Sequence, residues 1–502
     1  MLGATVHRRI YLVLLALLGG CMVTSIGMSN VVWVLLLTNW VFEGRWCEKW
    51  QRARESRLLQ AVGVLFLLHV AGLLWTTDLP AGLHVVERLL PWMAVPLVVL
   101  TSRPTEGRAR RIILGLYVGT VLVVTVIGLV RWLTVPGLPY RDIVPFISHI
   151  RFALNVCMAV FLLCSGEEVP VRSRIVRGLL VVWFLAFLLL LRSYTAFAVL
   201  PLATLAVIFR LRRRWLWLSV WVAVVGGMAA YVAAEYHSYH RLIPLATEPL
   251  RPLTAGGRPY LHRQDGLVEN GNYLHNYLCY DELHAVWPLR SCVPLEATTP
   301  SGYNVEASLI RYLNALGLTK DSAGVAALTA AQVDEIGHGV SNPVYVHGSL
   351  PRKMLYVIFF EFENYRCYRA VEGFSMLQRF ELWSAATHVV GRHPWAGVGT
   401  GDLEEAMESD FRATRSPLQG SRLMPHNEYL TLMALLGIPA FLLMAFFFFR
   451  AAPALRRQAL WMTAWTTAIL VSCLTENTLD SLAGILFSTW FMAFRKESQN
   501  NC

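Results

Sequence analysis

Apolar runs close to the length of a bilayer crossing recur along most of the chain, and they constrain the fold more than any other feature. A helix needs ~20 apolar residues to cross the hydrocarbon core, where its backbone polar groups must be satisfied internally. The composition agrees, because 55% of the 502 residues are hydrophobic and only 15% are charged, against about 25% charged in a typical soluble domain. The sequence therefore predicts an all-α polytopic membrane protein.

We predict twelve transmembrane helices from these runs. Their ranges are 10–28, 29–43, 59–76, 86–101, 112–134, 146–164, 178–191, 194–210, 215–234, 427–449, 459–475 and 482–494. Basic residues cluster on every second connection, for example Arg8 and Arg9 before the first span and Arg212 to Arg214 before the ninth. This alternation predicts cytoplasmic N- and C-termini. It also explains the net charge of +11 without a nucleic-acid partner, because the charges are spread over separate short loops.

One connection is far longer than the others, and it divides the chain into three predicted parts. Membrane helices occupy 1–234, a periplasmic loop domain occupies 235–425, and the last membrane helices with a cytoplasmic tail occupy 426–502. The loop has helical patterns near 303–317, 322–336, 375–390 and 402–413, and Asp402 is a candidate cap for the last of these. Cys279 and Cys292 either pair in an oxidising periplasm or remain free thiols.

Several familiar catalytic motifs are missing from the sequence. It contains no P-loop, no Asp-x-Asp nucleotide-sugar motif and no His-Glu-x-x-His zinc motif. We therefore expect no nucleotide, metal or other cofactor. The span centres also hold almost no acidic residues or lysines, whereas ion-coupled transporters place such groups midway across the membrane. Polar residues gather instead at the predicted outer ends of the spans.

One such end reads PHNEYLTLMALLG, from Pro425 to Gly437. His426, Asn427 and Gly437 are similar in identity and spacing to the motif of the bacterial O-antigen ligase and polymerase superfamily. Ala440 departs from it, because the family has Gly, Thr or Tyr at that position. Upstream, SMLQRFELWSAATHVVGRHPWAGVGTGD resembles the family's segment of an arginine, a tryptophan, a proline and Gly-x-Gly. The loop resembles that of the Bacteroidetes-type O-antigen ligases.

This resemblance implies a GT-C-like inner-membrane glycosyltransferase with one large, mainly helical periplasmic loop. It implies transfer of a glycan from an undecaprenyl-diphosphate carrier to a hydroxyl of the lipid A core or another glycan acceptor. It also implies an active site that faces the periplasm, among membrane lipids, and works without a metal or a nucleotide.

His426 is the candidate catalytic base, because an attacking hydroxyl must lose a proton and histidine accepts protons near neutral pH. The alternative is an interfacial histidine that orients the helix. Asn427 would orient the ring or cap the helix, and Glu428 shares the same first turn. Glu476 follows the eleventh span, where the family has an acidic residue, and would orient His426, hold an arginine, or serve as a plain interfacial carboxylate.

Arginines are the candidates for the diphosphate, because guanidinium groups bind phosphate oxygens bidentately. Arg379 matches the family's loop arginine, and Arg192 resembles a second family arginine at a turn between spans. Arg151 has a similar placement. The alternatives are a solvated helix face for Arg379 and snorkelling for Arg192.

Three functions share this chemistry: an O-antigen ligase, a polysaccharide polymerase and a protein O-oligosaccharyltransferase. A lipid-linked glycan transporter is the alternative from another class. The acceptor pocket lies in the variable loop, so the sequence does not separate ligase from polymerase, and it names neither the glycan nor the oligomeric state.

Overall fold

The computed structural model describes residues 3–166, 168–264, 266–299, 302–371, 375–456 and 458–495. It divides into two compact units, of which the first joins Met1–Trp221 to Arg379–Cys502 and the second is Val222–Gln378. The predicted loop segment 235–425 is thereby shared, because its last part, from Arg379 onward, belongs to the first unit. Arg457 and Lys496, which belong to two of the basic clusters, lie outside the described residues.

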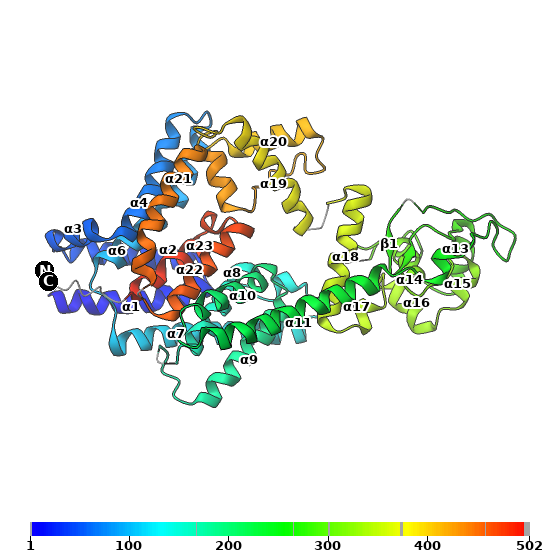
Figure 1. Cartoon of the computed structure of the whole chain (residues 1–502), viewed down its shortest axis with the longest axis horizontal. Coiled ribbons are helices and arrows are strands. Elements are labelled where there is room, and N and C mark those ends of the chain that lie inside the picture. The colour runs from blue at the N-terminus through cyan, green and yellow to red at the C-terminus, as the bar shows by residue number, and fades with distance from the viewer. Residues whose placement is uncertain are drawn as a thin grey trace. The chain divides into compact units, whose positions relative to one another are not determined.

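The first unit is a bundle of helices (Figure 1). Its elements are α1 Ala4–Thr24, α2 Ile26–Phe42, α3 Trp46–Glu55, α4 Arg57–Ala71, η1 Gly72–Leu74, α5 Leu79–Arg88, α6 Leu90–Thr101, α7 Gly107–Thr134, η2 Tyr140–Asp142, α8 His149–Cys164, α9 Arg174–Leu191, α10 Tyr194–Ile208, α20 Leu403–Thr414, α21 Glu428–Arg456, α22 Leu460–Thr475, η4 Thr478–Asp480, α23 Leu482–Thr489 and η5 Trp490–Phe494. Two more helices, α11 Arg214–His240 and α19 Ser375–Arg392, cross the boundary between the units.

Serine side chains define where several helices of the first unit begin. Ser25, Ser56, Ser173 and Ser193 precede α2, α4, α9 and α10, and each side-chain oxygen accepts a hydrogen bond from a backbone amide in the first turn. Such caps satisfy amides that have no partner within the helix. The apolar runs then continue as helix until the next break.

Large aromatic side chains fill the centre of this bundle. Trp465 and Trp490 are almost fully buried, and their indole nitrogens donate to the backbone oxygens of Phe487 and Leu15, each at 2.9 Å. The ring of Phe491 packs against both indoles. Buried indole groups need such partners, because an unpaired donor away from water is costly.

Seven described helices are long and apolar enough to cross a membrane, or eight if the bent pair α2–α3 counts as one span. Four further apolar helices, α8, α10, α22 and the α23–η5 pair, are shorter. Each of the twelve predicted spans overlaps with one of these helices. The multi-pass helical class is therefore confirmed, while the number of twelve crossings stays a prediction.

The second unit contains short helices around a small two-stranded antiparallel sheet. Its elements are α12 Pro244–Thr247, β1 Val268–Glu269, β2 Asn272–Tyr273, α13 Tyr280–Val286, η3 Trp287–Leu289, α14 Val305–Ala315, α15 Ser322–Ala326, α16 Ala330–Gly337, α17 Val344–His347 and α18 Leu350–Tyr368. Trp287, Leu309 and Leu313 are buried in its hydrophobic core. Cys279 is buried and Cys292 is exposed, and both are free thiols.

Candidate active site

Helix α21, which begins just after His426, is broken at Gly437. Gly437 has φ 82° and ψ 164°, a conformation that only glycine adopts readily. Two residues later, Pro439 has no amide hydrogen, so the carbonyl of Leu435 loses its usual partner within the helix. The amide of Ile438 donates out of the helix, to the carbonyl oxygen of Pro394 at 2.8 Å. The break therefore leaves helix carbonyls that need donors from elsewhere.

The Gly-Val-Gly turn after α19 supplies those donors. The amides of Val398 and Gly399 donate to the carbonyl oxygens of Ala434 and Leu435, each at 2.9 Å. A Cβ atom at Gly397 would lie 2.3 Å from the carbonyl oxygen of Leu435, so the two backbones approach too closely for any other residue. The Gly-x-Gly segment and the motif glycine thus serve one purpose, the contact of a loop backbone with a broken helix.

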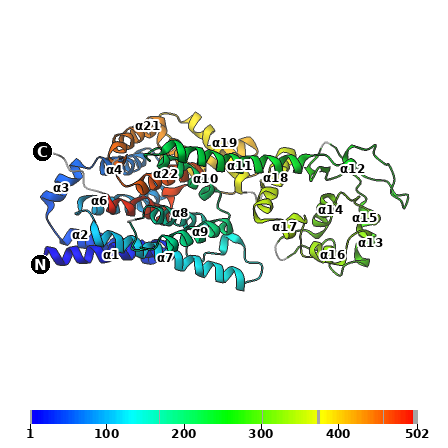
Figure 2. The ribbon, with the colours of Figure 1, turned by 60° about the horizontal axis from the view of Figure 1, so that its bottom comes forward.

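The residues that follow this turn bind the connection between α4 and α5. The hydroxyl of Thr400 donates to the carbonyl oxygen of His69 at 2.7 Å. The Asp402 carboxylate accepts from the amides of Thr77 and Asp78 at 2.7 and 2.8 Å. The prediction that Asp402 caps the next helix is therefore wrong: it occupies the cap position of α20, but its side chain makes no capping bond. Helices α4 and α21 lie side by side (Figures 1 and 2), and this loop connects them.

His426 lies at the start of α21, with a left-handed backbone conformation of φ 49°. Asn427 caps the helix, because its side-chain oxygen accepts from the amide of Leu430 at 3.1 Å. The imidazole of His426 is 40% exposed, and its Nδ1 lies 3.4 Å from Oε2 of Glu476. The ring thus has one nitrogen against a carboxylate and a second, Nε2, for another partner.

Glu476 lies between α22 and η4, and its side chain is only 7% exposed. Its second oxygen, Oε1, pairs with Nη2 of Arg379 from α19, a side chain that is 15% exposed. Burial by itself raises the pKa of Glu476, but the hydrogen bond from His426 and the charges of Arg379 and Arg151 outweigh it, so the pKa lies below its usual value. One ionised carboxylate therefore holds the candidate base and a candidate phosphate ligand together.

Arg151 lies in the first turn of α8 and holds the segment that follows Glu476. Its Nε donates to the hydroxyl of Ser481 at 3.2 Å, and its Nη2 donates to the carbonyl oxygen of Asn477 at 2.6 Å. From the other side, the Glu428 carboxylate accepts from the amide of Leu479 at 2.9 Å. These bonds fix the loop that presents Glu476 to His426.

Arg192 ends α9 in a left-handed conformation, and its guanidinium lies 5.6 Å from the centre of the Tyr140 ring. Among the described residues, that guanidinium makes no hydrogen bond. The ring of Tyr140 also packs edge-on against His149, at 5.6 Å between ring centres. The hydroxyls of Thr195 and Thr475 are 3.1 Å apart, so the helix after Arg192 begins beside the residue that precedes Glu476.

The structure therefore brings His426, Arg379, Glu476 and Arg151 into one cluster, with Asn427 and Glu428 supporting it. Arg192 is linked to that cluster through neighbouring elements rather than by direct contact. Sequence reasoning missed Tyr140, Arg88 and Asp480; Arg88 Nη1 lies 2.8 Å from Oδ1 of Asp480, close to this cluster in the fold. No motif marks these three. Among the described residues, no group of three His, Cys, Asp or Glu side chains is arranged to hold a metal ion.

Residues 323–445 match the family model of the O-antigen ligases. This segment, rather than the whole chain, is similar to the O-antigen ligase family. The resemblance inferred from the motifs to the O-antigen ligase and polymerase superfamily is thereby confirmed, although the match covers less than half of the chain. A comparison with curated proteins gives no significant match.

The match supports ligase- or polymerase-type activity in this multi-pass membrane protein. Arg379, the Gly-Val-Gly turn and His426 all fall within the matched O-antigen ligase domain, as does Gly437. Glu476 lies beyond its end, and Arg151 and Arg192 lie before its start. The candidate cluster thus combines residues of the matched domain with residues of the remaining helices.

Proposed function

We propose that this chain is an inner-membrane O-antigen ligase that transfers a glycan from an undecaprenyl-diphosphate carrier to a hydroxyl of the lipid A core. The observation that carries the proposal is the placement of Glu476 between His426 and Arg379. A general base and a phosphate-binding group must lie near one another for such a transfer, since the attacked carbon is bonded to the leaving diphosphate.

In the proposed mechanism, His426 acts as the general base. Glu476 accepts a hydrogen bond from Nδ1–H, which leaves Nε2 free to take the proton of the acceptor hydroxyl. As the acceptor oxygen forms its bond to the anomeric carbon, the bond from that carbon to the diphosphate oxygen breaks. The diphosphate leaves with the bonding electrons, and the proton stays on the imidazole until solvent removes it.

Arginines would stabilise the charge of the leaving diphosphate. Arg379, Arg151 and Arg88 lie around three carboxylates, Glu476, Asp480 and Glu428. Arg192 at the neighbouring turn brings the arginines to four, one more than the carboxylates. Such preorganised positive charge favours an anionic leaving group.

The contacts separate the roles of the individual arginines. Arg192 makes no side-chain hydrogen bond with the residues that the structure describes, and we propose it as a diphosphate ligand beside Arg379. The guanidinium of Arg151 donates hydrogen bonds to the loop after Glu476. Its contacts favour a positioning role over the diphosphate-binding role expected from the sequence.

Deletion of the gene followed by electrophoresis of the lipopolysaccharide tests the reaction type. A ligase predicts polymer-free lipid A core together with carrier-linked polymer that accumulates. A core capped by a single repeat unit would indicate a polymerase instead, and unchanged lipopolysaccharide with an unglycosylated protein would indicate protein O-glycosylation.

Complementation tests the residue assignment in the same strain. His426→Ala should fail to restore the polymer, and His338→Ala should restore it. The side chain of His338 is 75% exposed and, among the described residues, its hydrogen bond and ion pair are with Asp334 alone. Membrane levels of both variants must be equal. Restoration by His426→Ala would contradict the assignment.

The proposal also requires a periplasmic active site and cytoplasmic termini, which the alternating basic clusters support. Reporter fusions at residue 300 should report the periplasm, and fusions at residue 213 the cytoplasm. The reverse pattern would place the cluster on the side of the membrane that lacks the acceptor.

A further inference from the structure

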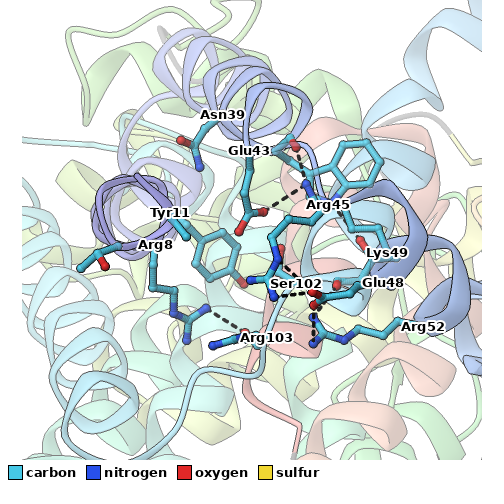
Figure 3. Close-up of a pocket in the computed structure, with 14 residues that line it drawn as sticks. Arg8, Tyr11, Asn39, Glu43, Arg45, Glu48, Lys49, Arg52, Ser102 and Arg103 are labelled. Atoms are coloured by element: carbon cyan, nitrogen blue, oxygen red, sulfur yellow. Dashed lines mark hydrogen bonds and ion pairs between the residues drawn. The ribbon is translucent and has the colours of Figure 1, made fainter. Parts of the chain in front are cut away.

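A polar cavity lies in the first unit where α1 begins, α2 ends, α3 follows and α6 ends (Figure 3). Its volume is about 230 Å3. The charged side chains in its wall are Arg8, Glu43, Arg45, Glu48, Lys49, Arg52 and Arg103. Five cations thus face two carboxylates, and the wall carries an excess of three positive charges. None of these residues belongs to the cluster around Glu476.

The two carboxylates are already paired. Glu43 lies 3.0 Å from Nζ of Lys49, which is buried and also sits over the Trp40 ring at 4.6 Å. Glu48 accepts from Nε of Arg45 at 3.0 Å. These pairs neutralise one side of the cavity. Arg52 also reaches Glu48, with 3.7 Å between Nη2 and Oε2, whereas Arg8 and Arg103 have no acidic partner among the described residues.

Two of the arginines, Arg8 and Arg52, are held at the cavity by backbone carbonyls. Arg8 donates to the carbonyl oxygens of Arg103 and Pro104, both at 2.8 Å, and Arg52 donates to that of Thr101 at 3.0 Å. The Arg103 side chain is exposed and makes no hydrogen bond or ion pair with other described residues. Arg8 contacts the backbone of Arg103, and both residues line the cavity, so two guanidinium groups with donors to spare border the same space.

Helix α3, which forms part of the cavity wall, has the features of a helix at a membrane surface. Helix α3 turns away from α2 by 117°, at a break of at most four residues. It carries Trp46 and Trp50 with 53% and 66% of their surfaces exposed, beside several charged residues. Exposed tryptophans on a short polar helix at the end of a span are typical of the headgroup region, where an indole meets both hydrocarbon and water.

We propose that this cavity binds the phosphodiester headgroup of an anionic phospholipid, with Arg8 and Arg103 as ligands of the phosphate. Guanidinium groups suit phosphate oxygens in charge and geometry. A lipid fits better than a soluble anion, because the tryptophans of α3 place the cavity beside acyl chains. The site lies at the end of the bundle where the basic clusters predict the cytoplasmic leaflet, and it is separate from the proposed glycan transfer.

Binding of short-chain lipids to the purified full-length chain tests this proposal. Dihexanoyl phosphatidylglycerol, dihexanoyl phosphatidylcholine and inorganic phosphate would be titrated separately, with tryptophan fluorescence as the readout. We expect phosphatidylglycerol to bind about tenfold or more tightly than either of the others, because only it combines a net negative charge with acyl chains. Equal affinity for phosphatidylcholine, or equal affinity for phosphate alone, would overturn the proposal.

Arg103→Gln is the discriminating variant, because within the described part of the chain the exposed Arg103 side chain makes no hydrogen bond or ion pair that folding would lose. It should weaken phosphatidylglycerol binding about tenfold. Arg108→Gln is the matched control: Arg108 is exposed, lies five positions further along the chain and is not part of the cavity wall. It removes the same charge and should leave binding unchanged. Equal losses in both variants would mean that only general surface charge attracts the lipid, and would overturn the site.

Discussion

Gly437→Ala should destabilise the helical bundle of the first unit strongly. The new Cβ would lie 2.3 Å from the carbonyl oxygen of Trp395, inside the contact limit of the two atoms. Alanine at φ 82° and ψ 164° adds backbone strain of about 1–3 kcal/mol. Separation of the loop from the helix also breaks three hydrogen bonds, made by the amides of Val398, Gly399 and Ile438. Each lost hydrogen bond costs about 0.5–1.5 kcal/mol. Together with the backbone strain, the three bonds lower the free energy of unfolding by roughly 3–7 kcal/mol, a large fraction of a typical stability of about 5–15 kcal/mol.

Gly391→Ala is the matched control for this prediction. Gly391 lies in α19, and a Cβ atom there meets nothing within 4 Å. Alanine should be neutral or stabilise the helix by up to about 1 kcal/mol. The measurement is thermal unfolding of the purified chain in detergent, followed as the fraction that stays monodisperse. Equal unfolding temperatures for Gly437→Ala and Gly391→Ala would refute the account of the broken helix.

Four further results are expected. Transfer by the purified chain should persist in EDTA and without ATP; activity that is lost on chelation and restored by a divalent ion would contradict the arginine-based mechanism. Glu476→Gln should lower transfer about tenfold or more, since the ring of His426 loses its orienting carboxylate. The pKa of Glu476 is lower in the folded chain than its ordinary value of about 4.5. The ionised carboxylate therefore stabilises the fold above about pH 4.5, and this stabilisation is lost as the pH falls through the folded-state pKa. The stability difference between wild type and Glu476→Gln should thus shrink in acid. Burial lowers the pKa of Lys320 to about 7. Between about pH 7 and 10.5 the unfolded chain therefore binds more protons than the folded chain, and the free energy of unfolding should rise with pH across that range. Lys320→Met should lack this rise when its thermal unfolding is measured over the same range.

The helical framework follows from local sequence, whereas the contacts of the site do not. An apolar run or a serine cap can be recognised from a few neighbouring residues, without knowledge of the rest of the chain. For that reason the predicted spans coincide with helices. Asp402 shows where prediction from local sequence fails. Its position before an amphipathic helix predicts a cap, but its carboxylate binds amides near Thr77, a contact between distant parts of the chain that no local pattern reveals.

The candidate site divides in the same way. The family motif led to His426 and Arg379, and the position after an apolar run led to Glu476. The role of Arg151 in holding the loop depends on a turn, residues 477–481, that becomes visible only when α8 and α22 pack together. Tyr140 lies beside Arg192 because two connections meet at one end of the bundle, and neither connection carries a recognisable motif. The basic residues of the cavity at α3 were read as topology signals alone, since their convergence depends on the bend between α2 and α3.

The most direct test of the central claim compares donor binding with transfer in two variants of the purified chain. Undecaprenyl-diphosphate glycan serves as the donor, and lipid A core as the acceptor. His426→Ala should bind the donor as the wild type does while transfer falls ~10²–10⁴-fold, because a general base acts only in the proton transfer. Arg379→Ala should lose donor binding and transfer together. Substantial transfer by folded His426→Ala, or wild-type donor binding by Arg379→Ala, would show that the base and the diphosphate ligand lie elsewhere.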